Sequence, residues 1–449
     1  MAGYQKLNIL LKEELDAFYE EGFDIDKKAL TAEIDVAGDD KAKLMSIYSK
    51  LLSAKMRNDY KYEEPSDYES IVKASEGGNN IIKVGTDFDR FYGAWLGRCI
   101  GNALGIPVEL WHYSVIRTWF EKAGKYPING YVPTHSRAEA EDNMRVGGSV
   151  VTDENISYMV TDDDIRYTVL GLMLTDRLGS SFDTYDVGAN WVYNLPFRAL
   201  CTAENQAYLN FSNVDEFGPW GKPDNAMSYF EKNKVNTYLN PYREWIGAQI
   251  RIDAYGYAAA GNPHLAAKMA YTDAYLSHTK NGIYGAMFFA ALIAAAFVGK
   301  DIDVCIKAAA AEIPLKSRFY EMIDKAVYIG RNSSSPEQVV AEVNALYPEY
   351  NYVHTINNAA ICIASLVYSK GDFNKAVGLS VMCGMDTDCN GATVGSVMGA
   401  FCGEKGIADH WKLPLNDTLY SGLTVYNPVK ISDIARKSME IQQRIQIKE

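Results

Sequence analysis

Two runs of glycine with the same four-residue spacing constrain this chain more than any other feature. They are Gly93, Gly97, Gly101 and Gly105, and then Gly391, Gly395, Gly399 and Gly403. A spacing of four is close to the helical period, so each run forms one stripe along a helix. Glycine inside a helix costs about 1 kcal/mol relative to alanine, so such stripes need a compensating contact, usually the backbone of another helix. The sequence therefore predicts two smooth helices that cross closely.

Acidic residues lie at one end of each glycine run. Glu109 follows the first run, and Asp386 and Asp388 precede the second. A further cluster, T-D-D-D at 161–164, stands where a loop-rich region meets a predicted helix. One carboxylate is enough to cap a helix, and three adjacent carboxylates repel one another. We therefore weigh a bound cation equally with the simpler interpretation, that these residues cap the helix. Carboxylate oxygens suit hard ions such as Mg²⁺ or Mn²⁺.

The composition restricts the class of protein. The 449 residues are 48% hydrophobic and carry a net charge of −13, which argues against binding to nucleic acid or to an anionic membrane surface. The length allows one large domain with an appendage, or two domains. Seven cysteines without a C-x-x-C pair favour reduced thiols and a cytoplasmic location. The apolar stretches Gly285–Val298 and Gly391–Cys402 are too short to span a bilayer, so we expect buried helices.

Helical periodicity runs along most of the chain, and we expect an all-α fold. Residues 1–80 are predicted to form an N-terminal helical extension, with Ser66 as an N-cap and the linker Glu76–Asn80 at its end. Residues 81–449 would form the main domain, with a loop-rich region at 110–160 and an irregular, aromatic region at 205–244. Helices are predicted over 164–174, 244–259, 263–277, 282–298, 302–312, 317–329, 335–346, 357–368 and 373–382.

Four motifs resemble those of the ADP-ribosylglycohydrolase family and occur in the family's order over residues 88–410. They are G-A-W-L-G-R-C-I-G-N-A-L-G-I-P-V-E, T-D-D-D, S-H-T-K-N-G-I-Y-G-A and G-M-D-T-D-C-N-G-A-T-V-G-S. The resemblance implies an all-α catalytic domain with a binuclear Mg²⁺ (or Mn²⁺) centre in a cleft. It also implies hydrolysis of a glycosidic bond to the anomeric carbon of ADP-ribose, in a small molecule or an ADP-ribosylated substrate. The first 80 residues lie outside it.

The resemblance also implies roles for individual residues. Its metal ligands correspond to Thr161, Asp162, Asp163, Asp386 and Asp388, with Asp164 as the alternative to Thr161. Its catalytic carboxylates correspond to Glu109, Asp163 and Asp386. We expect His278, Asn102 and His354 to contact the substrate, although a helix-end histidine bonded to backbone is an equally simple interpretation of either imidazole.

Two residues depart from the family pattern. Asn102 stands where many members have Asp, and Cys389 stands where a hydroxyl residue commonly completes the metal site. A neutral thiol is a poor Mg²⁺ ligand, so these changes leave the substrate open. One alternative is the same metal chemistry on another ribosyl or glycosyl compound, such as a nucleoside. Another is a non-catalytic, crystallin-like relative, although such a protein would not need the acidic clusters.

Overall fold

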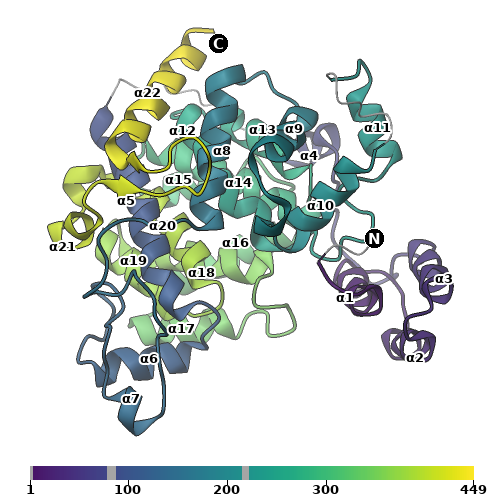
Figure 1. Ribbon diagram of the computed structural model, residues 1–449, viewed down its shortest axis with the longest axis horizontal. Helices are drawn as coiled ribbons and strands as arrows, with labels where there is room; N and C mark the ends of the chain where they lie inside the picture. Colours follow the sequence, from purple (N-terminus) through teal and green to yellow (C-terminus); the bar gives the residue numbers. More distant parts are fainter. Residues whose placement is uncertain (1–3, 78–86, 215–221, 449) are drawn as a thin grey trace.

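The computed structural model describes residues 4–77, 87–214 and 222–448. Its centre is a pair of helices, α5 (Phe88–Gly105) and α20 (Thr387–Cys402), which lie against each other along their length (Figure 1). A Cβ atom added at Gly101 would lie 1.8 Å from the carbonyl oxygen of Gly391. The prediction of two closely crossing helices is therefore confirmed.

Other helices of the main domain surround this pair. Among them, α14 (Lys280–Ala296) is buried from Asn281 to its end, as expected for so apolar a stretch. α17 (Pro336–Asn344) begins as its sequence suggests, because the Ser335 hydroxyl accepts a hydrogen bond from the Gln338 amide at 3.3 Å. The other α-helices are α6 (Tyr113–Lys122), α7 (Ala138–Glu141), α8 (Asp163–Leu178), α9 (Thr184–Asn194), α10 (Thr202–Ser212), α11 (Ala226–Lys232), α12 (Asp253–Ala258), α13 (Pro263–Ala274), α15 (Ile302–Ala310), α16 (Arg318–Asn332), α18 (Thr355–Ser369), α19 (Phe373–Met382), α21 (Asp409–Lys412) and α22 (Ile431–Lys448).

Short elements complete the main domain. The 3₁₀ turns are η1 (Ile106–Val108), η2 (Phe197–Ala199), η3 (Ile246–Arg251), η4 (Glu404–Gly406) and η5 (Leu413–Leu415). In the described ranges the one sheet is an antiparallel pair of two-residue strands, β1 (Thr418–Leu419) and β2 (Val429–Lys430). The expected all-α class is thus confirmed. None of the helices placed in the structure combines the length and apolar character that crossing a bilayer requires.

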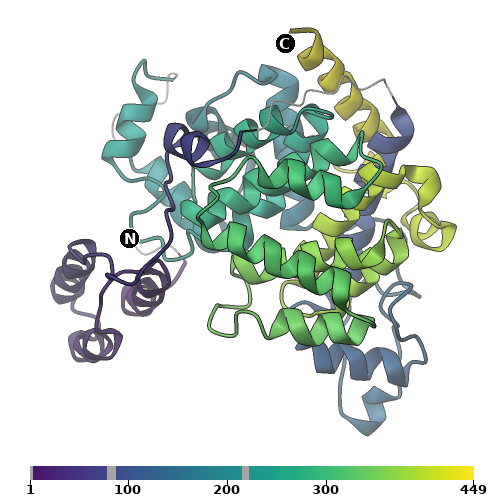
Figure 2. The same ribbon diagram turned by 180° about the vertical axis from the view of Figure 1, so that it is seen from behind.

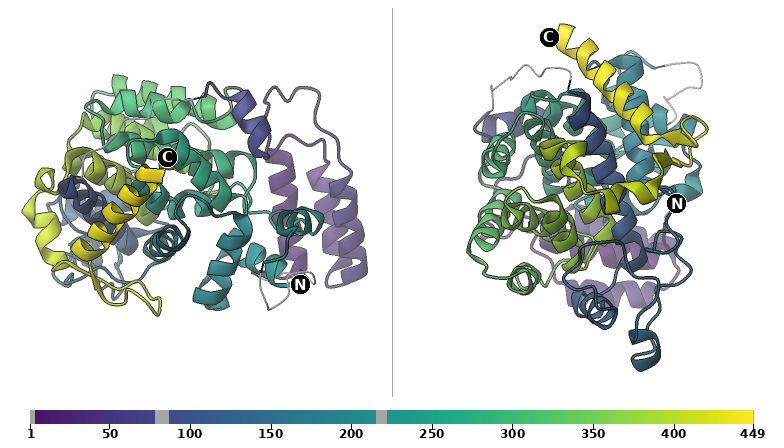
Figure 3. Two further views of the ribbon diagram at one scale, coloured as in Figure 1. Left: turned by 90° about the horizontal axis from the view of Figure 1, so that it is seen from above. Right: turned by 90° about the vertical axis from the view of Figure 1, so that its left-hand side faces the viewer.

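The N-terminal extension is helical, as predicted. It contains α1 (Leu7–Glu20), α2 (Lys27–Ala37), α3 (Lys41–Leu52) and α4 (Tyr68–Ala74). The first three lie side by side at one edge of the molecule, whereas α4 lies against the main domain (Figures 2 and 3). The N-cap of α4 is Asp67 rather than Ser66, because Asp67 accepts from the Ser70 amide while the Ser66 hydroxyl accepts from Lys280 of the main domain. The predicted boundary near residue 80 lies outside the described residues.

Two predicted segments differ from the structure. The stretch 244–259 is not one helix: η3 is followed by α12, with Arg251 at the break, where its guanidinium pairs with Glu204 and Asp273. The stretch 205–244 is partly regular, since α10 covers its beginning and α11 follows. The buried polar groups on α10, such as Glu204 and Gln206, hide its apolar periodicity; Glu204 pairs with Arg251 of η3, and Gln206 donates to Asn210 within the helix.

Candidate metal centre

The ends of three helical segments meet at the candidate site. The end of α5 continues through η1 to Glu109, and the helices α8 and α20 both begin beside it. Gly105 makes this possible, because a Cβ atom there would lie 2.2 Å from the amide nitrogen of Asp388. The Leu110 amide also donates to the Met385 carbonyl at 3.2 Å, which ties the loop after α5 to the loop before α20. Glu109 and the aspartates of α20 are thereby brought together.

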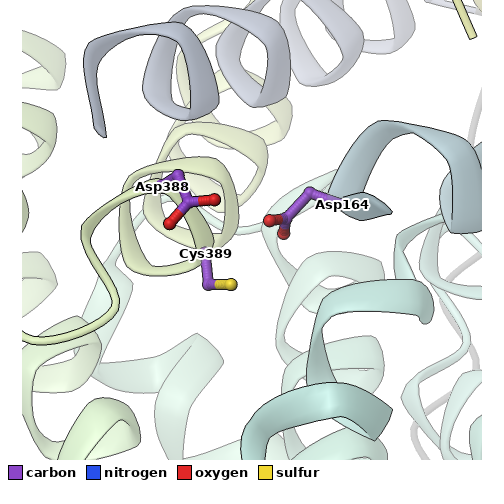
Figure 4. A group of neighbouring side chains, drawn as sticks. All are labelled: Asp164, Asp388 and Cys389. Carbon is purple, nitrogen blue, oxygen red and sulfur yellow. The ribbon is translucent and has the colours of Figure 1, made fainter. Parts of the chain in front are cut away.

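The acidic side chains form three overlapping groups, each with ligand atoms within 4.8 Å of one another. The groups are Glu109, Asp386 and Asp388; Asp162, Asp163 and Asp164; and Asp164, Asp388 and Cys389. Figure 4 shows the last of these, with the carboxylates of Asp164 and Asp388 pointing toward one another and the Cys389 sulfur beside them. The two acidic motifs, more than two hundred residues apart in the sequence, thus belong to one site.

The aspartates at the helix starts do not act as ordinary caps. Asp162 and Asp386 occupy the N-cap positions of α8 and α20, yet neither side chain accepts the capping hydrogen bond. By contrast, Asp301 and Asp372 do accept it at the starts of α15 and α19. The positive ends of α8 and α20 still favour negative charge at this point. The arrangement therefore disfavours the interpretation of the clusters as helix caps.

Burial makes it energetically costly for the carboxylates of this site to be ionised without a counter-ion. It raises the pKa of Asp162, Asp164 and Asp388 well above the ordinary value, and neighbouring aspartates raise the pKa of each further. Glu109 lies at the exposed rim, where partial burial, followed by the charges of Asp386 and Asp163, raises its pKa to about 7. A bound cation would relieve this repulsion.

The buried Arg98 and Asn102 of α5 organise one side of the cluster. The Arg98 guanidinium donates to Asp164 Oδ1 at 3.1 Å and lies 3.0 Å from Asp253, with all three side chains fully buried. The Asn102 amide nitrogen lies 3.4 Å from both Asp162 Oδ2 and Asp164 Oδ2. Asn102 therefore touches the acidic cluster directly.

Two polar oxygens at the site lack a partner. Asp388 Oδ1 and Asn102 Oδ1 are buried and accept no hydrogen bond from any group that the structure describes. Buried acceptors of this kind are costly unless an electropositive partner is supplied. The donor set, six aspartate or glutamate carboxylates close together and unpaired with lysine, fits divalent cations. Asp162, Asp163, Asp386 and Asp388 all belong to these groups, and their role as metal ligands stays a prediction.

Thr161 and Asp164 lie in different surroundings. Thr161 is exposed, and its hydroxyl is 3.3 Å from Arg166 and close to Gly422. Asp164 is fully buried and faces Asp388. The geometry brings Asp164 into two of the three acidic groups. Which of the two serves as a ligand remains a prediction.

The two candidate histidines are fully buried. His278 Nδ1 is 2.8 Å from the Ser277 hydroxyl, and its pKa is lowered well below the ordinary value, first by burial and then by Arg251. His354 is the N-cap of α18, where Nδ1 accepts from the Ile356 amide at 3.1 Å. Neither ring belongs to the acidic groups. Contact with a substrate therefore stays a prediction for both imidazoles.

Asn358 supports the site and was not among the predicted residues. Its Oδ1 accepts from the Asp386 amide at 3.3 Å and from Asn390 Nδ2 at 2.8 Å, so it holds the loop before α20 that carries Asp386. Arg98 and Asp253 were also missed, because no local pattern reveals an ion pair between distant helices.

Comparisons with known proteins identify the family of this chain. A solved structure described as an ADP-ribosylglycohydrolase-related protein complex aligns with 80% of this chain and 98% of its own, at 16% identity and a TM-score of 0.47. No curated protein matches the sequence significantly. The family model for ADP-ribosylglycohydrolase matches residues 84–443. The chain therefore belongs to the ADP-ribosylglycohydrolase family and is a glycosidase-type hydrolase.

Proposed function

We propose that this hydrolase uses a pair of divalent cations, Mg²⁺ or Mn²⁺, to cleave an N- or O-glycosidic bond at the anomeric carbon of an ADP-ribosylated substrate. The observation that carries the proposal is the convergence of Glu109, Asp386 and Asp388 with the aspartates at the start of α8 in one cluster, of which Asp164, Asp386 and Asp388 are buried. The cations would be held by Asp162, Asp163, Asp386 and Asp388, with Thr161 or Asp164 completing the set. When bound, they supply positive charge that fixes ribose hydroxyls and acidifies a water.

The carboxylates of this chain would carry the proton transfer. Glu109 lies at the rim with a raised pKa, and it accepts a proton from the attacking water as that oxygen bonds to the anomeric carbon. Asp163 and Asp386 orient this water and stabilise the oxocarbenium-like state through their negative charge. The bond from the anomeric carbon to the leaving nitrogen or oxygen breaks as the water oxygen bonds to that carbon, and the leaving group takes up a proton from solvent. Asn102, which lies at the cluster, would contact the substrate, as would His278 and His354.

Thermal melting with added ligands tests the proposal. We expect the melting temperature to rise with Mg²⁺ and to rise further with ADP-ribose, because both bind only the folded chain. Both increments should vanish in the double variant Asp386→Ala, Asp388→Ala. A matched control is Asp301→Ala, Asp303→Ala, which removes the same D-x-D spacing from the start of α15, outside the cluster, where Asp301 accepts from the Asp303 amide at 2.8 Å. The control should retain both increments.

The other outcomes separate the rival functions. A metal increment without an ADP-ribose increment would move the substrate to another ribosyl or glycosyl compound, which a product assay on free nucleosides would identify. Absence of any metal increment, with no metal in the purified protein, would contradict the metal-dependent mechanism and favour a non-catalytic relative.

A further inference from the structure

The cation positions implied by the cluster are not chemically equivalent. The group Glu109, Asp386 and Asp388 offers only carboxylate oxygens, whereas the group Asp164, Asp388 and Cys389 adds a sulfur. We propose, resting on the metal-dependent function above, that Cys389 is a direct ligand and that the position it shares with Asp164 and Asp388 takes a thiophilic divalent ion of the Zn²⁺ class. The all-oxygen position keeps a hard cation. Asp388 belongs to both groups and would bridge them.

The geometry of the sulfur-containing group suits one ion. Its three ligand atoms lie within 4.8 Å of one another. Two ligands of one zinc ion are separated by at most about 4.6 Å, twice the longest ligand distance, so small movements of the side chains would bring all three onto one ion. The three side chains are 0%, 4% and 6% exposed for Asp164, Asp388 and Cys389 respectively. Three protein ligands leave a fourth tetrahedral position open, as in catalytic zinc sites.

Unpartnered oxygens provide an independent indication of a ligand at this place. Asp388 Oδ1 and Asn102 Oδ1 accept no hydrogen bond from the described residues, and the two residues are 4% and 0% exposed. Of the two, Asp388 belongs to the acidic groups themselves, whereas it is the nitrogen of the Asn102 amide that faces Asp162 and Asp164. An electropositive ion here would satisfy acceptors that the protein leaves without donors.

Ligand chemistry decides which ion is favoured. Mg²⁺ prefers octahedral oxygen coordination, whereas a thiolate selects softer ions. Binding forms one metal–sulfur bond, and the thiol proton passes to solvent with no change of oxidation state. The charge of the ion makes this possible even in acidic surroundings, because a coordinating thiol is deprotonated outright.

Cobalt substitution tests the sulfur ligand without measuring activity. Co²⁺ added to the wild-type protein should give a sulfur-to-cobalt charge-transfer band in the near ultraviolet, and the band should be absent in Cys389→Ser. The control Cys362→Ser removes another buried thiol, whose sulfur lies 3.3 Å from Asn390 Oδ1, and should leave the band unchanged. We also expect Cys389→Ser to weaken Zn²⁺ binding more than about 100-fold, the upper end of what the loss of a supporting partner costs. The Mg²⁺-dependent rise in melting temperature should remain.

A second measurement needs no variant. X-ray absorption of the wild-type protein loaded with Zn²⁺ should show one sulfur neighbour at about 2.3 Å. A shell of oxygen and nitrogen only, or a cobalt band that survives Cys389→Ser, would overturn the proposal while leaving the metal-dependent hydrolase intact. Failure of every ion to bind would overturn both. A higher affinity for Zn²⁺ than for Mg²⁺ does not suffice, because most protein sites show that order.

Discussion

At the scale of single residues, Arg98 holds a permanent positive charge against the acidic cluster. Its guanidinium pairs with Asp164 and Asp253, and all three side chains are fully buried. The desolvation of such ions is offset only while every partner is present, so removing one leaves the others uncompensated. Arg98 also fixes the carboxylate of Asp164 that faces Asp388, and it therefore affects both stability and the metal centre.

We expect Arg98→Met to lower the free energy of unfolding by about 3–5 kcal/mol, because two buried carboxylates lose their counter-ion. Adding Asp253→Asn should recover part of that loss. Chemical denaturation of the single and double variants measures both effects. Arg117→Met is the control, because Arg117 pairs with Glu121 on the exposed face of α6, where such pairs contribute at most about 1 kcal/mol. An equal loss in both single variants would contradict the assigned role of Arg98.

The sequence predicts the acidic residues of the site but not their supports. Asp162, Asp163, Asp386 and Asp388 stand out because carboxylates cluster locally at predicted helix starts. Arg98 and Asn358 carry no such signal, since their partners lie on other helices and become neighbours only through folding. A single sequence records which groups are present, not which distant groups they meet.

At the scale of the elements, the glycines of α5 and α20 determine how closely the two helices approach. Added Cβ atoms at Gly97 and Gly395 would each lie 2.0 Å from a carbonyl oxygen of the opposite helix. Backbone atoms cannot move aside as a flexible side chain can, so larger residues would force the helices apart. The separation of α5 and α20 in turn determines how closely Glu109, which follows α5, approaches Asp388 in the first turn of α20.

We therefore expect Gly101→Ala to destabilise the protein by more than about 3 kcal/mol, above the usual range for overpacking. Metal-dependent stabilisation should weaken as well, because the variant moves the end of α5 away from α20. Gly171→Ala in α8 is the matched control, since its Cβ atom would meet the Ala254 Cβ at 3.0 Å rather than a carbonyl oxygen. Urea denaturation measures the free energy of unfolding of both variants. Comparable stability of the two would show that the helix pair can separate without cost.

Element prediction succeeded where spacing is a local property. The glycine stripes and the apolar run of α14 are readable because a helix imposes its period on its own residues. The predicted helix at 244–259 is divided into η3 and α12, and the Arg251 side chain at the division pairs with Glu204 and Asp273, which its local sequence does not reveal. α10 was overlooked because part of its buried face is polar, with Glu204 paired to Arg251 of η3.

At the scale of the whole molecule, the N-terminal extension is joined to the main domain by a buried interface. Leu10, Leu15 and Leu44 pack with Ala203 and Tyr242 of the main domain in one apolar cluster. Ion pairs accompany this cluster: Arg243 lies 2.7 Å from Glu14 and 2.5 Å from Glu21, and Arg318 lies 2.8 Å from Glu64. The buried charge pairs make the extension an integral part of the folded molecule, because separating it would expose apolar surface and leave these charges without their partners.

Glu20, the last residue of α1, gives this interface a pH dependence. Burial, followed by the charges of Glu244 and Asp16, raises its pKa to about 8. The charged or titratable groups that face Glu20 are Glu244, Asp16, Arg318, Lys27 and His354. The His354 Nε2 atom lies 4.0 Å from the Glu20 carboxylate. Burial lowers the pKa of His354 well below the ordinary value, so this imidazole stays neutral across the pH range concerned.

The sign of the effect follows from the raised pKa. In the unfolded chain a glutamate loses its proton near pH 4.3, whereas folded Glu20 keeps its proton until about pH 8. Between these values the folded state binds more protons, so its stability falls as the pH rises, by at most about 1.4 kcal/mol per pH unit. We expect Glu20→Gln to remove this slope, so that the variant melts above the wild type at pH 8 and the difference shrinks toward pH 5. Melting curves across that range measure it, with the exposed Glu349→Gln as control. A difference that is constant with pH would show that Glu20 is ionised in the folded protein and that the interface contains no neutral acid.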